Sequence, residues 1–181
     1  MRALGYAGAN VTMPFKADVI EHLDSVSEVA REMNAVNTIT FRGGRAHGDN
    51  TDGAGLLSEI EAEGTPVTGS RILLLGTGGA ASSIWTQAAL DGAAAVSVFN
   101  RAKPELESIG ATLSQLSERT GCALSLQTFE GGGLEAACAE ADIIINATSV
   151  GMDRLADDTL VDARWITPRH TVADVVYHPR I

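Results

Sequence analysis

One segment near the middle of the chain restricts the fold more than any other. Residues Arg71–Ala81 form a short apolar strand pattern that passes directly into a glycine turn and the start of a helix. Gly76 permits the tight turn, Gly78 lets the backbone approach a pyrophosphate, and Ala81 lets helix and strand pack closely. The free N–H groups and the positive dipole end of the helix then face the phosphates, so the segment predicts a dinucleotide-binding site. The expected contacts in this turn are Gly76, Gly78, Gly79 and Ala80.

The rest of the chain from about residue 72 alternates apolar runs with helix-length segments. This pattern is typical of a parallel sheet that is covered by helices on both faces. The expected strands are Ile72–Leu75, Ala95–Phe99, Ala123–Thr128, Asp142–Ala147 and Thr171–Tyr177, and the expected helices are Ala80–Leu90, Pro104–Arg119 and Leu134–Ala139. The predicted fold class is therefore α/β, with a Rossmann-like doubly wound parallel sheet.

The first fifty residues have a different character. We expect two short amphipathic helices, a hairpin that turns at Gly43-Gly44, and a further helix that leads into the larger unit. The ranges are Ala17–Leu23 and Ser25–Met33 for the short helices, Val36–Phe41 and Arg45–Gly48 for the hairpin, and Gly53–Glu63 for the further helix. A segment of this size is too short to form a closed layer by itself, so we expect it to pack on the larger unit or to belong to a larger structure.

Composition excludes several classes of partner. The 181 residues include 13 Lys and Arg against 23 Asp and Glu, and the net charge of −10 repels nucleic acids and anionic membranes. No apolar run approaches the roughly 18 residues of a membrane helix and no signal peptide is recognisable, so we expect a cytoplasmic protein. Cys122 and Cys138 lack CxxC spacing and the four histidines are scattered, which favours buried free thiols and surface histidines over a metal site.

Four further motifs, read in order around the glycine turn, point to a family. They are Gly8–Lys16, Asn34–Ile39 with Gly48–Gly53, Asn146–Met152 and Asp174–Pro179. In this series the chain closely resembles the shikimate dehydrogenase family over nearly its whole length. The resemblance implies an NADP-dependent oxidoreductase of the shikimate pathway, in which a substrate domain and a nucleotide domain face each other across a cleft. It assigns residues 1–52 to a partial α/β substrate-binding domain and residues 53–181 to an NADP-binding Rossmann-like domain.

The resemblance also implies a catalytic pair, Lys16 and Asp52. Reduction of 3-dehydroshikimate to shikimate needs a proton at the carbonyl oxygen as hydride reaches carbon, and a lysine beside a carboxylate can hold and pass that proton. Taken alone, Lys16 reads as a solvated lysine at a helix start. Asp52 alone reads as the N-cap of the helix that begins near Gly53.

Substrate contacts are implied at four positions, Asn10, Thr12, Asn37 and Tyr177. Neutral groups that both donate and accept hydrogen bonds suit the hydroxyls of a polyol. For Thr12 and Asn37 the alternative is a capping role in a turn. For Tyr177, which aligns with a family tyrosine near the substrate carboxylate, the alternative is a core residue with a solvated hydroxyl.

The choice of nicotinamide cofactor depends on the loop after the second strand of the parallel sheet. A site for NAD places an acid at that strand end, whereas here the strand is followed by Asn100, Arg101 and Lys103, whose cations suit the 2′-phosphate of NADP. The alternative is that both cations are ordinary surface charges. Thr148, Ser149 and Met152 follow the fourth strand, and in the family this loop lies beside the nicotinamide.

The chain differs from the family at both ends. Family members have a further stretch that includes two carboxylate-binding serines before the position of Met1, and a later segment with a substrate-binding glutamine, so the chain looks truncated at both ends. We therefore expect apolar residues of the first unit to be exposed and to promote self-association. These residues are Val11, Ile20, Val29, Val36 and Ile39. The alternatives are a non-catalytic NADP-binding module and a quinate/shikimate dehydrogenase that uses NAD.

Overall fold

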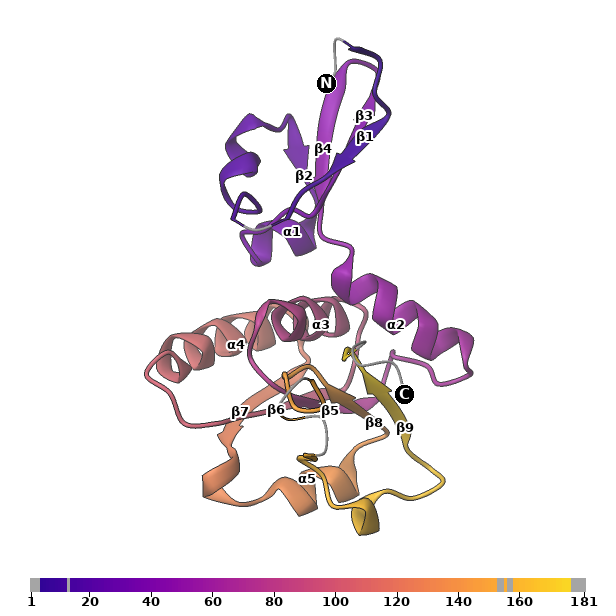
Figure 1. Ribbon diagram of the computed structural model, residues 1–181, viewed down its shortest axis with the longest axis vertical. Helices are drawn as coiled ribbons and strands as arrows, with labels where there is room; N and C mark the ends of the chain where they lie inside the picture. Colours follow the sequence, from indigo (N-terminus) through magenta and orange to yellow (C-terminus); the bar gives the residue numbers. More distant parts are fainter. Residues whose placement is uncertain (1–3, 13, 153–154, 156–157, 177–181) are drawn as a thin grey trace.

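Two β-sheets organise the part of the chain that the computed structural model describes, residues 4–12, 14–152, 155 and 158–176. The first sheet has the order β1-β3-β4-β2, and the second has the order β7-β6-β5-β8-β9. Figure 1 shows the first sheet at one end of the molecule, with α1 on the side that faces the helices of the second sheet. The chain passes from one sheet to the other between β4 and α2.

The first sheet is mixed and built around a hairpin. Its strands are β1 (Gly8–Asn10), β2 (Ser25–Val26), β3 (Thr38–Arg42) and β4 (Arg45–Asp49). Strand β3 pairs antiparallel with both β1 and β4, and β2 pairs parallel with β4. The hairpin turns at Gly43 and Gly44, whose φ angles of 55° and 75° suit glycine, so the predicted hairpin is confirmed.

The two short helices predicted in this unit are only partly correct. The first is a 3-10 helix, Asp18–His22, and the second is divided into β2 and the helix α1 (Glu28–Glu32). The division has a tertiary cause, because Ser25 and Val26 pair with His47 and Gly48 of β4. Helix α1 begins only after Ser27, whose hydroxyl accepts a hydrogen bond from the N–H of Ala30 at 3.2 Å and caps the helix.

Apolar side chains of the first unit are more buried than the sequence suggested. Val36 is 0% exposed, and Val29 and Ile39 are each 8% exposed. Val11 and Ile20 are partly buried and pack against the same cluster. The prediction that these five residues are exposed is wrong, because α1 and the 3-10 helix cover one face of the hairpin. Self-association was inferred from that exposure and stays a prediction.

The second sheet is parallel throughout and confirms the predicted α/β class. Its strands are β5 (Arg71–Leu75), β6 (Ala95–Asn100), β7 (Ala123–Thr128), β8 (Ile143–Asn146) and β9 (Thr171–Asp174). The helices are α2 (Asp52–Ala62), α3 (Gly79–Leu90), α4 (Leu106–Thr120) and α5 (Leu134–Glu140), and the 3-10 helices are η3 (Phe129–Gly131) and η5 (Ala163–Trp165). Helix α4 begins at Leu106 rather than at Pro104, which lies in the preceding turn.

The central strands β5, β6 and β8 are buried on both faces, and successive side chains along each strand enter opposite cores. Ile72 and Leu74 of β5 face the core with α2, α3 and α4, whereas Leu73 and Leu75 face the core with α5 and η5. Figure 1 shows these helices on opposite sides of the sheet. None of the helices in the described part of the chain is long and apolar enough to cross a bilayer.

One close contact fixes α2, which follows the first unit, on α3, and a set of ion pairs joins the first unit to α4. Gly53 of α2 packs so closely on α3 that a Cβ atom there would lie 2.3 Å from the carbonyl oxygen of Ser83. Arg119 of α4 forms ion pairs with two acids of α1, Glu28 at 3.1 Å and Glu32. The hydrogen bond with Glu32 is the main reason that the pKa of Arg119 is raised. The packing holds α2 on α3, and the ion pairs hold α1 beside α4.

Candidate active site and cofactor pocket

The glycine turn after β5 has the geometry that its sequence predicted. Gly76 has a φ angle of 111°, and its N–H donates a hydrogen bond to the carbonyl oxygen of Phe99 at 2.7 Å. A Cβ atom at Gly76 would lie 2.6 Å from the carbonyl oxygen of Ala147, whereas at Gly78 it would meet no heavy atom within 4 Å. Gly76 is therefore required for the turn itself, and Gly78 leaves space open.

That space is the mouth of a pocket of about 750 Å³ at the carboxyl ends of β5, β6 and β8. The pocket is lined by Gly76, Thr77, Gly78, Asn100, Arg101, Ala102, Lys103, Phe129, Glu130, Ala147, Thr148, Ser149, Val150, Leu155 and Leu160. Helix α3 begins at its edge, and no side chain caps the helix at Gly78. The hydroxyl of Thr77 is buried and has no hydrogen-bond partner among the described residues. Uncapped N–H groups and an unpartnered hydroxyl are donors suited to a pyrophosphate.

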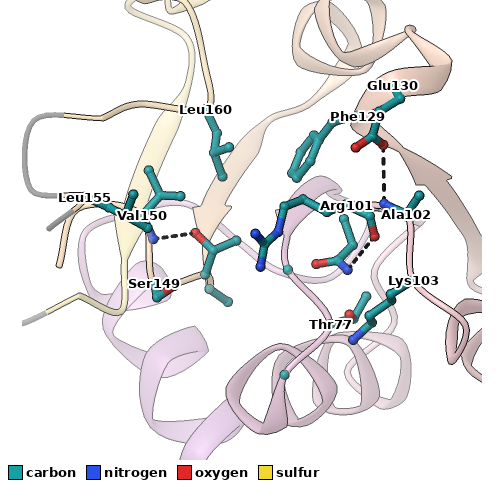
Figure 2. A pocket seen from close by; sticks show the side chains of 15 residues that line it. Thr77, Arg101, Ala102, Lys103, Phe129, Glu130, Ser149, Val150, Leu155 and Leu160 are labelled. Carbon is teal, nitrogen blue, oxygen red and sulfur yellow. Dashed lines mark hydrogen bonds between the residues drawn. The ribbon is translucent and has the colours of Figure 1, made fainter. Parts of the chain in front are cut away.

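The loop after β6 supplies the cationic side of the pocket. Figure 2 shows the side chain of Arg101 reaching across it and Lys103 at its edge. The side chain of Asn100 is held in the lining, because its Nδ2 donates a hydrogen bond to the carbonyl oxygen of Arg101 at 2.9 Å. The three predicted residues of this loop therefore lie together in the lining.

An acid that the sequence analysis missed lies opposite this loop. Glu130 of η3 follows β7, and its Oε2 accepts a hydrogen bond from the N–H of Ala102 at 3.3 Å (Figure 2). Its neighbour Phe129 stacks on Phe99 with ring centroids 6.2 Å apart. The end of β6 itself carries no acid, and Glu130 reaches the same loop from the end of the neighbouring strand β7. Glu130 could have been found from the predicted sheet, because β6 and β7 are neighbours and their carboxyl ends lie side by side.

A hydrogen-bond network holds the loop after β8. The Nδ2 of Asn146 donates to both carboxylate oxygens of Asp174 at 3.1 Å, and its Oδ1 accepts from the hydroxyl of Thr148 at 2.7 Å. Thr148 and Ser149 line the pocket, but Met152 does not, and neither do Gly79 and Ala80 of the glycine turn. The predicted cofactor contacts are thus brought to one pocket only in part.

The predicted catalytic pair is in contact. The Nζ of Lys16 lies 3.1 Å from the Oδ2 of Asp52, with side-chain exposures of 29% and 46%. The Oδ1 of Asp52 accepts a hydrogen bond from the Nδ2 of Asn37 at 2.7 Å. The N-cap position of α2 belongs to Thr51, so the carboxylate of Asp52 binds two side chains rather than capping the helix.

Asn37 is the centre of this arrangement. The side chain is buried, and its Oδ1 accepts hydrogen bonds from the N–H of Thr51 at 3.0 Å and the hydroxyl of Thr38 at 2.9 Å. These contacts fix the amide so that Nδ2 faces Asp52. A backbone hydrogen bond also holds Lys16 near Asn37. The carbonyl oxygen of Lys16 accepts the N–H of Val36, the residue before Asn37, at 2.8 Å.

The other predicted substrate residues are less constrained. Asn10 lies at the end of β1 opposite Thr38, and it is exposed. Thr12 is also exposed, and its carbonyl oxygen accepts the N–H of Phe15 at 3.0 Å. Tyr177 lies outside the described residues.

Two residues that sequence reasoning missed connect the Lys16–Asp52 pair to the helix that begins at the pocket. Ser83, one turn inside α3, is fully buried and accepts a hydrogen bond from the N–H of Gly53 at 2.5 Å. Its hydroxyl also lies 3.3 Å from the Oδ1 of Asn50, which accepts the N–H of Asp52. The start of α2 is thereby tied to the first turn of α3, about 6 Å along the helix from the end that opens into the pocket.

The remaining titratable residues give no sign of a metal centre. Among the described residues, no group of three or more His, Cys, Asp or Glu side chains could hold a metal ion. Cys122 and Cys138 are buried and unpaired, as predicted. Burial raises the pKa of both thiols.

The parallel sheet, the glycine turn and the cationic loop together define a Rossmann-type dinucleotide-binding protein, and its first unit adds a buried amide that orients a Lys–Asp pair. Comparison with known proteins narrows this class. The model of the shikimate dehydrogenase substrate binding domain matches residues 1–39. The NADP(+)-type shikimate dehydrogenase of Alkaliphilus oremlandii is 35% identical over 180 residues, which are 99% of this chain and 62% of that protein.

Solved structures agree with this result. Shikimate 5-dehydrogenase from Listeria monocytogenes, in complex with shikimate and NAD, is similar with a TM-score of 0.90 and 36% identity, over 98% of this chain and 62% of that one. The Thermus thermophilus enzyme in complex with NADP(H) and shikimate has a TM-score of 0.68 and 31% identity, over 97% and 60%. The resemblance to the shikimate dehydrogenase family is therefore confirmed. The chain spans about 60% of the length of these relatives.

Proposed function

We propose that the protein acts as a shikimate dehydrogenase, which reduces 3-dehydroshikimate reversibly to shikimate with NADPH in the pathway to chorismate and the aromatic amino acids. The observation that supports this most strongly is the contact of Lys16 with Asp52, tied through Ser83 to the helix end at the cofactor pocket. A proton-carrying pair and a nicotinamide site must lie close together in such an enzyme. The names of the relatives supply the substrate and the cofactor.

The proposal divides the chain into two functional parts. Residues 1–52 belong to the substrate-binding domain, and residues 53–181 form the NADP-binding domain. The division falls where β4 ends at Asp49 and α2 begins at Asp52. Asp52 is thus the last residue of the first part and the first residue of α2, and its carboxylate is bound by Lys16 and Asn37 of the first part.

The pocket fits NADP by the chemistry of its donors. We assign the pyrophosphate to the uncapped start of α3 at Gly78, Gly79 and Ala80, where the buried hydroxyl of Thr77 has no partner among the described residues. Arg101 and Lys103 would bind the 2′-phosphate beside Asn100. Thr148 and Ser149 would border the nicotinamide, and Met152 is assigned to the same loop. When bound, the cofactor supplies or accepts the hydride at the substrate carbon.

Lys16 would deliver the proton. Its ammonium carries three N–H donors, and the contact with Asp52 uses one of them, so another can face the oxygen of the substrate carbonyl. Asp52 orients the ammonium, and Asn37 orients Asp52 through the 2.7 Å hydrogen bond. In the reverse direction the same Nζ would hold the proton that leaves the hydroxyl.

Binding of the polyol falls to neutral side chains in this proposal. The Nδ2 of Asn37 has one N–H beyond the one it donates to Asp52, which suits a single substrate hydroxyl. Thr12 and Asn10 are exposed at the end of β1 and would supply further hydroxyl contacts. Tyr177 keeps its proposed place near the substrate carboxylate.

The test follows NADPH absorbance with shikimate as substrate and compares three variants of the full chain. Lys16→Met and Asp52→Asn should each lower kcat by about 10²–10⁴-fold, the usual contribution of a positioned acid or base. Asp18→Asn makes the same charge change at an exposed position of the 3-10 helix and should leave kcat unchanged. NADP affinity, measured by calorimetry, should be the same in all three.

Two results would contradict the proposal. Turnover that is unaffected by both substitutions would refute the role of the pair. Tight NADP binding without any oxidation of shikimate would instead identify a non-catalytic NADP-binding module. A strong preference for quinate over shikimate would keep the mechanism and replace the substrate.

A further inference from the structure

Glu130 is an acid in a pocket whose other charged lining residues, Arg101 and Lys103, are cations. It belongs to η3, a short turn that is fixed by the hydrogen bond from the N–H of Gly131 to the hydroxyl of Thr128 at 3.2 Å. Its Oε2 accepts the N–H of Ala102, which directly follows Arg101. The carboxylate is thus held at the loop after β6 although it comes from the neighbouring strand end.

This position matters because the loop after β6 is where a Rossmann-type site recognises the adenosine ribose. An acid there accepts a hydrogen bond from the 2′-hydroxyl of NAD, whereas cations there bind the 2′-phosphate of NADP. The pocket contains both kinds of group. In the described structure Glu130 forms no ion pair with Arg101 or Lys103, so neither cation neutralises it by direct contact.

The contact with Ala102 leaves most acceptor positions of the Glu130 carboxylate unused. A carboxylate has about four acceptor positions, and the 3.3 Å hydrogen bond uses one of them. Glu130 is exposed and lines the pocket, as Figure 2 shows. The remaining positions are therefore open to a hydroxyl on a bound nucleotide.

We propose that Glu130 is a specificity-determining residue that accepts the 2′-hydroxyl of NAD and disfavours the 2′-phosphate of NADP, so that the pocket binds both cofactors. The inference rests on the proposed function, because it assigns this pocket to a nicotinamide dinucleotide. The phosphate is an anion and is repelled by the carboxylate, while Arg101 and Lys103 attract it. The two effects oppose each other at the same loop and reduce the discrimination between the cofactors.

Binding measurements on the full chain test this without any need for turnover. Calorimetric titration with NADP and with NAD is carried out on the wild type and on Glu130→Gln, which removes the charge and keeps an oxygen for the N–H of Ala102. Glu130→Gln should bind NADP at least about fivefold more tightly and NAD more weakly. Glu118→Gln makes the same charge change on the exposed side of α4 and should change neither affinity. The gain for NADP should shrink at high ionic strength.

The outcomes separate this inference from the proposed function. If the wild type binds neither nucleotide, the proposed function fails. If it binds NADP and Glu130→Gln leaves both affinities within about twofold, the role of Glu130 is refuted and the proposed function stands. Glu130→Ala separates the charge from the loop contact. Weaker NADP binding in Glu130→Ala, with no effect in Glu130→Gln, would show that the residue only holds the loop and would also refute the inference.

Discussion

Replacement of Gly76 by alanine should destabilise the protein, whereas the same replacement at Gly78 should weaken cofactor binding and leave stability nearly unchanged. The two glycines flank one residue of the same turn and differ in backbone angle and surroundings. Gly76 has a φ angle of 111° and lies against Ala147, which follows β8, whereas Gly78 has a φ angle of −82° and open space beside it. The pair therefore separates the structural use of glycine from its use at a ligand site.

The magnitude at Gly76 follows from two costs and one gain. A side chain held at this positive φ costs about 1–3 kcal/mol. A Cβ atom 2.6 Å from the carbonyl oxygen of Ala147 forces backbone apart, which costs about 1–3 kcal/mol more. The lower entropy of the unfolded alanine chain returns about 0.4–1 kcal/mol. The free energy of unfolding should therefore fall by about 1–6 kcal/mol.

At Gly78 the expected change in stability is small. The backbone is extended there and a Cβ atom would meet no heavy atom within 4 Å. Alanine caps a helix slightly less well than glycine, and its lower unfolded-state entropy offsets that loss, so the net change should stay within about 0.5 kcal/mol. The added methyl group occupies space assigned to the pyrophosphate, and NADP affinity should fall at least about tenfold.

Urea denaturation measures the first quantity and calorimetric titration with NADP the second. Equal unfolding free energies for Gly76→Ala and the wild type would refute the account of the turn. A Gly78→Ala variant that binds NADP as tightly as the wild type would show that the pyrophosphate does not lie at this position.

Three further changes follow from buried polar groups. Ser83→Ala leaves a buried backbone N–H of α2 without its acceptor and should lower the unfolding free energy by about 1–3 kcal/mol in urea denaturation, whereas Ser82→Ala, at a half-buried neighbouring position, should not. Native Cys122 and Cys138 should react slowly with a thiol reagent near neutral pH and rapidly in urea, because burial raises the pKa of both thiols. Burial is also the main reason that the pKa of His170 is lowered, so the unfolding free energy should decrease as the pH falls from about 7 to about 5.

The direction of the last effect depends on which state takes up the proton first. An unfolded histidine protonates near its ordinary pKa of 6.5, and His170 in the folded chain protonates only at lower pH. Acid therefore stabilises the unfolded state relative to the folded state below that value, and the loss is absent above it. A His170→Gln variant should show a flatter dependence, and an identical pH profile would contradict this assignment. Rapid labelling of the native thiols would contradict their burial.

The parallel sheet could be predicted from the sequence because its strands are buried on both faces. Ile72–Leu75 and Ile143–Ile145 are continuous apolar runs, and such runs identify strands without help from the rest of the fold. The first sheet was harder to predict. Gly8–Asn10 contains no branched or aromatic residue and becomes a strand only because β3 pairs with it.

Some contacts of the candidate site could also be predicted from the sequence, and others could not. Contact between Lys16 and Asp52 was expected from family motifs, since neither residue alone distinguishes a proton carrier from a surface charge. The buried link through Asn50 and Ser83 was missed because it joins a loop to a helix far along the chain. Glu130 was missed because an acid was sought only on the strand that precedes the loop, although the sheet places the end of the next strand beside it.

The pairing of β5 also bears on the order in which the chain folds. Ile72 lies in register with Val96 of β6 and with Ile143 of β8, so one neighbour is close in sequence and the other is distant. Closing the longer loop costs more entropy, and we expect β5, β6 and β7 to associate before β8 arrives. Gly76 packs against Ala147, which directly follows β8. The glycine turn after β5 would then reach its final shape late in folding, and a chain emerging from the ribosome would acquire the proposed cofactor affinity only after β8 has been synthesised.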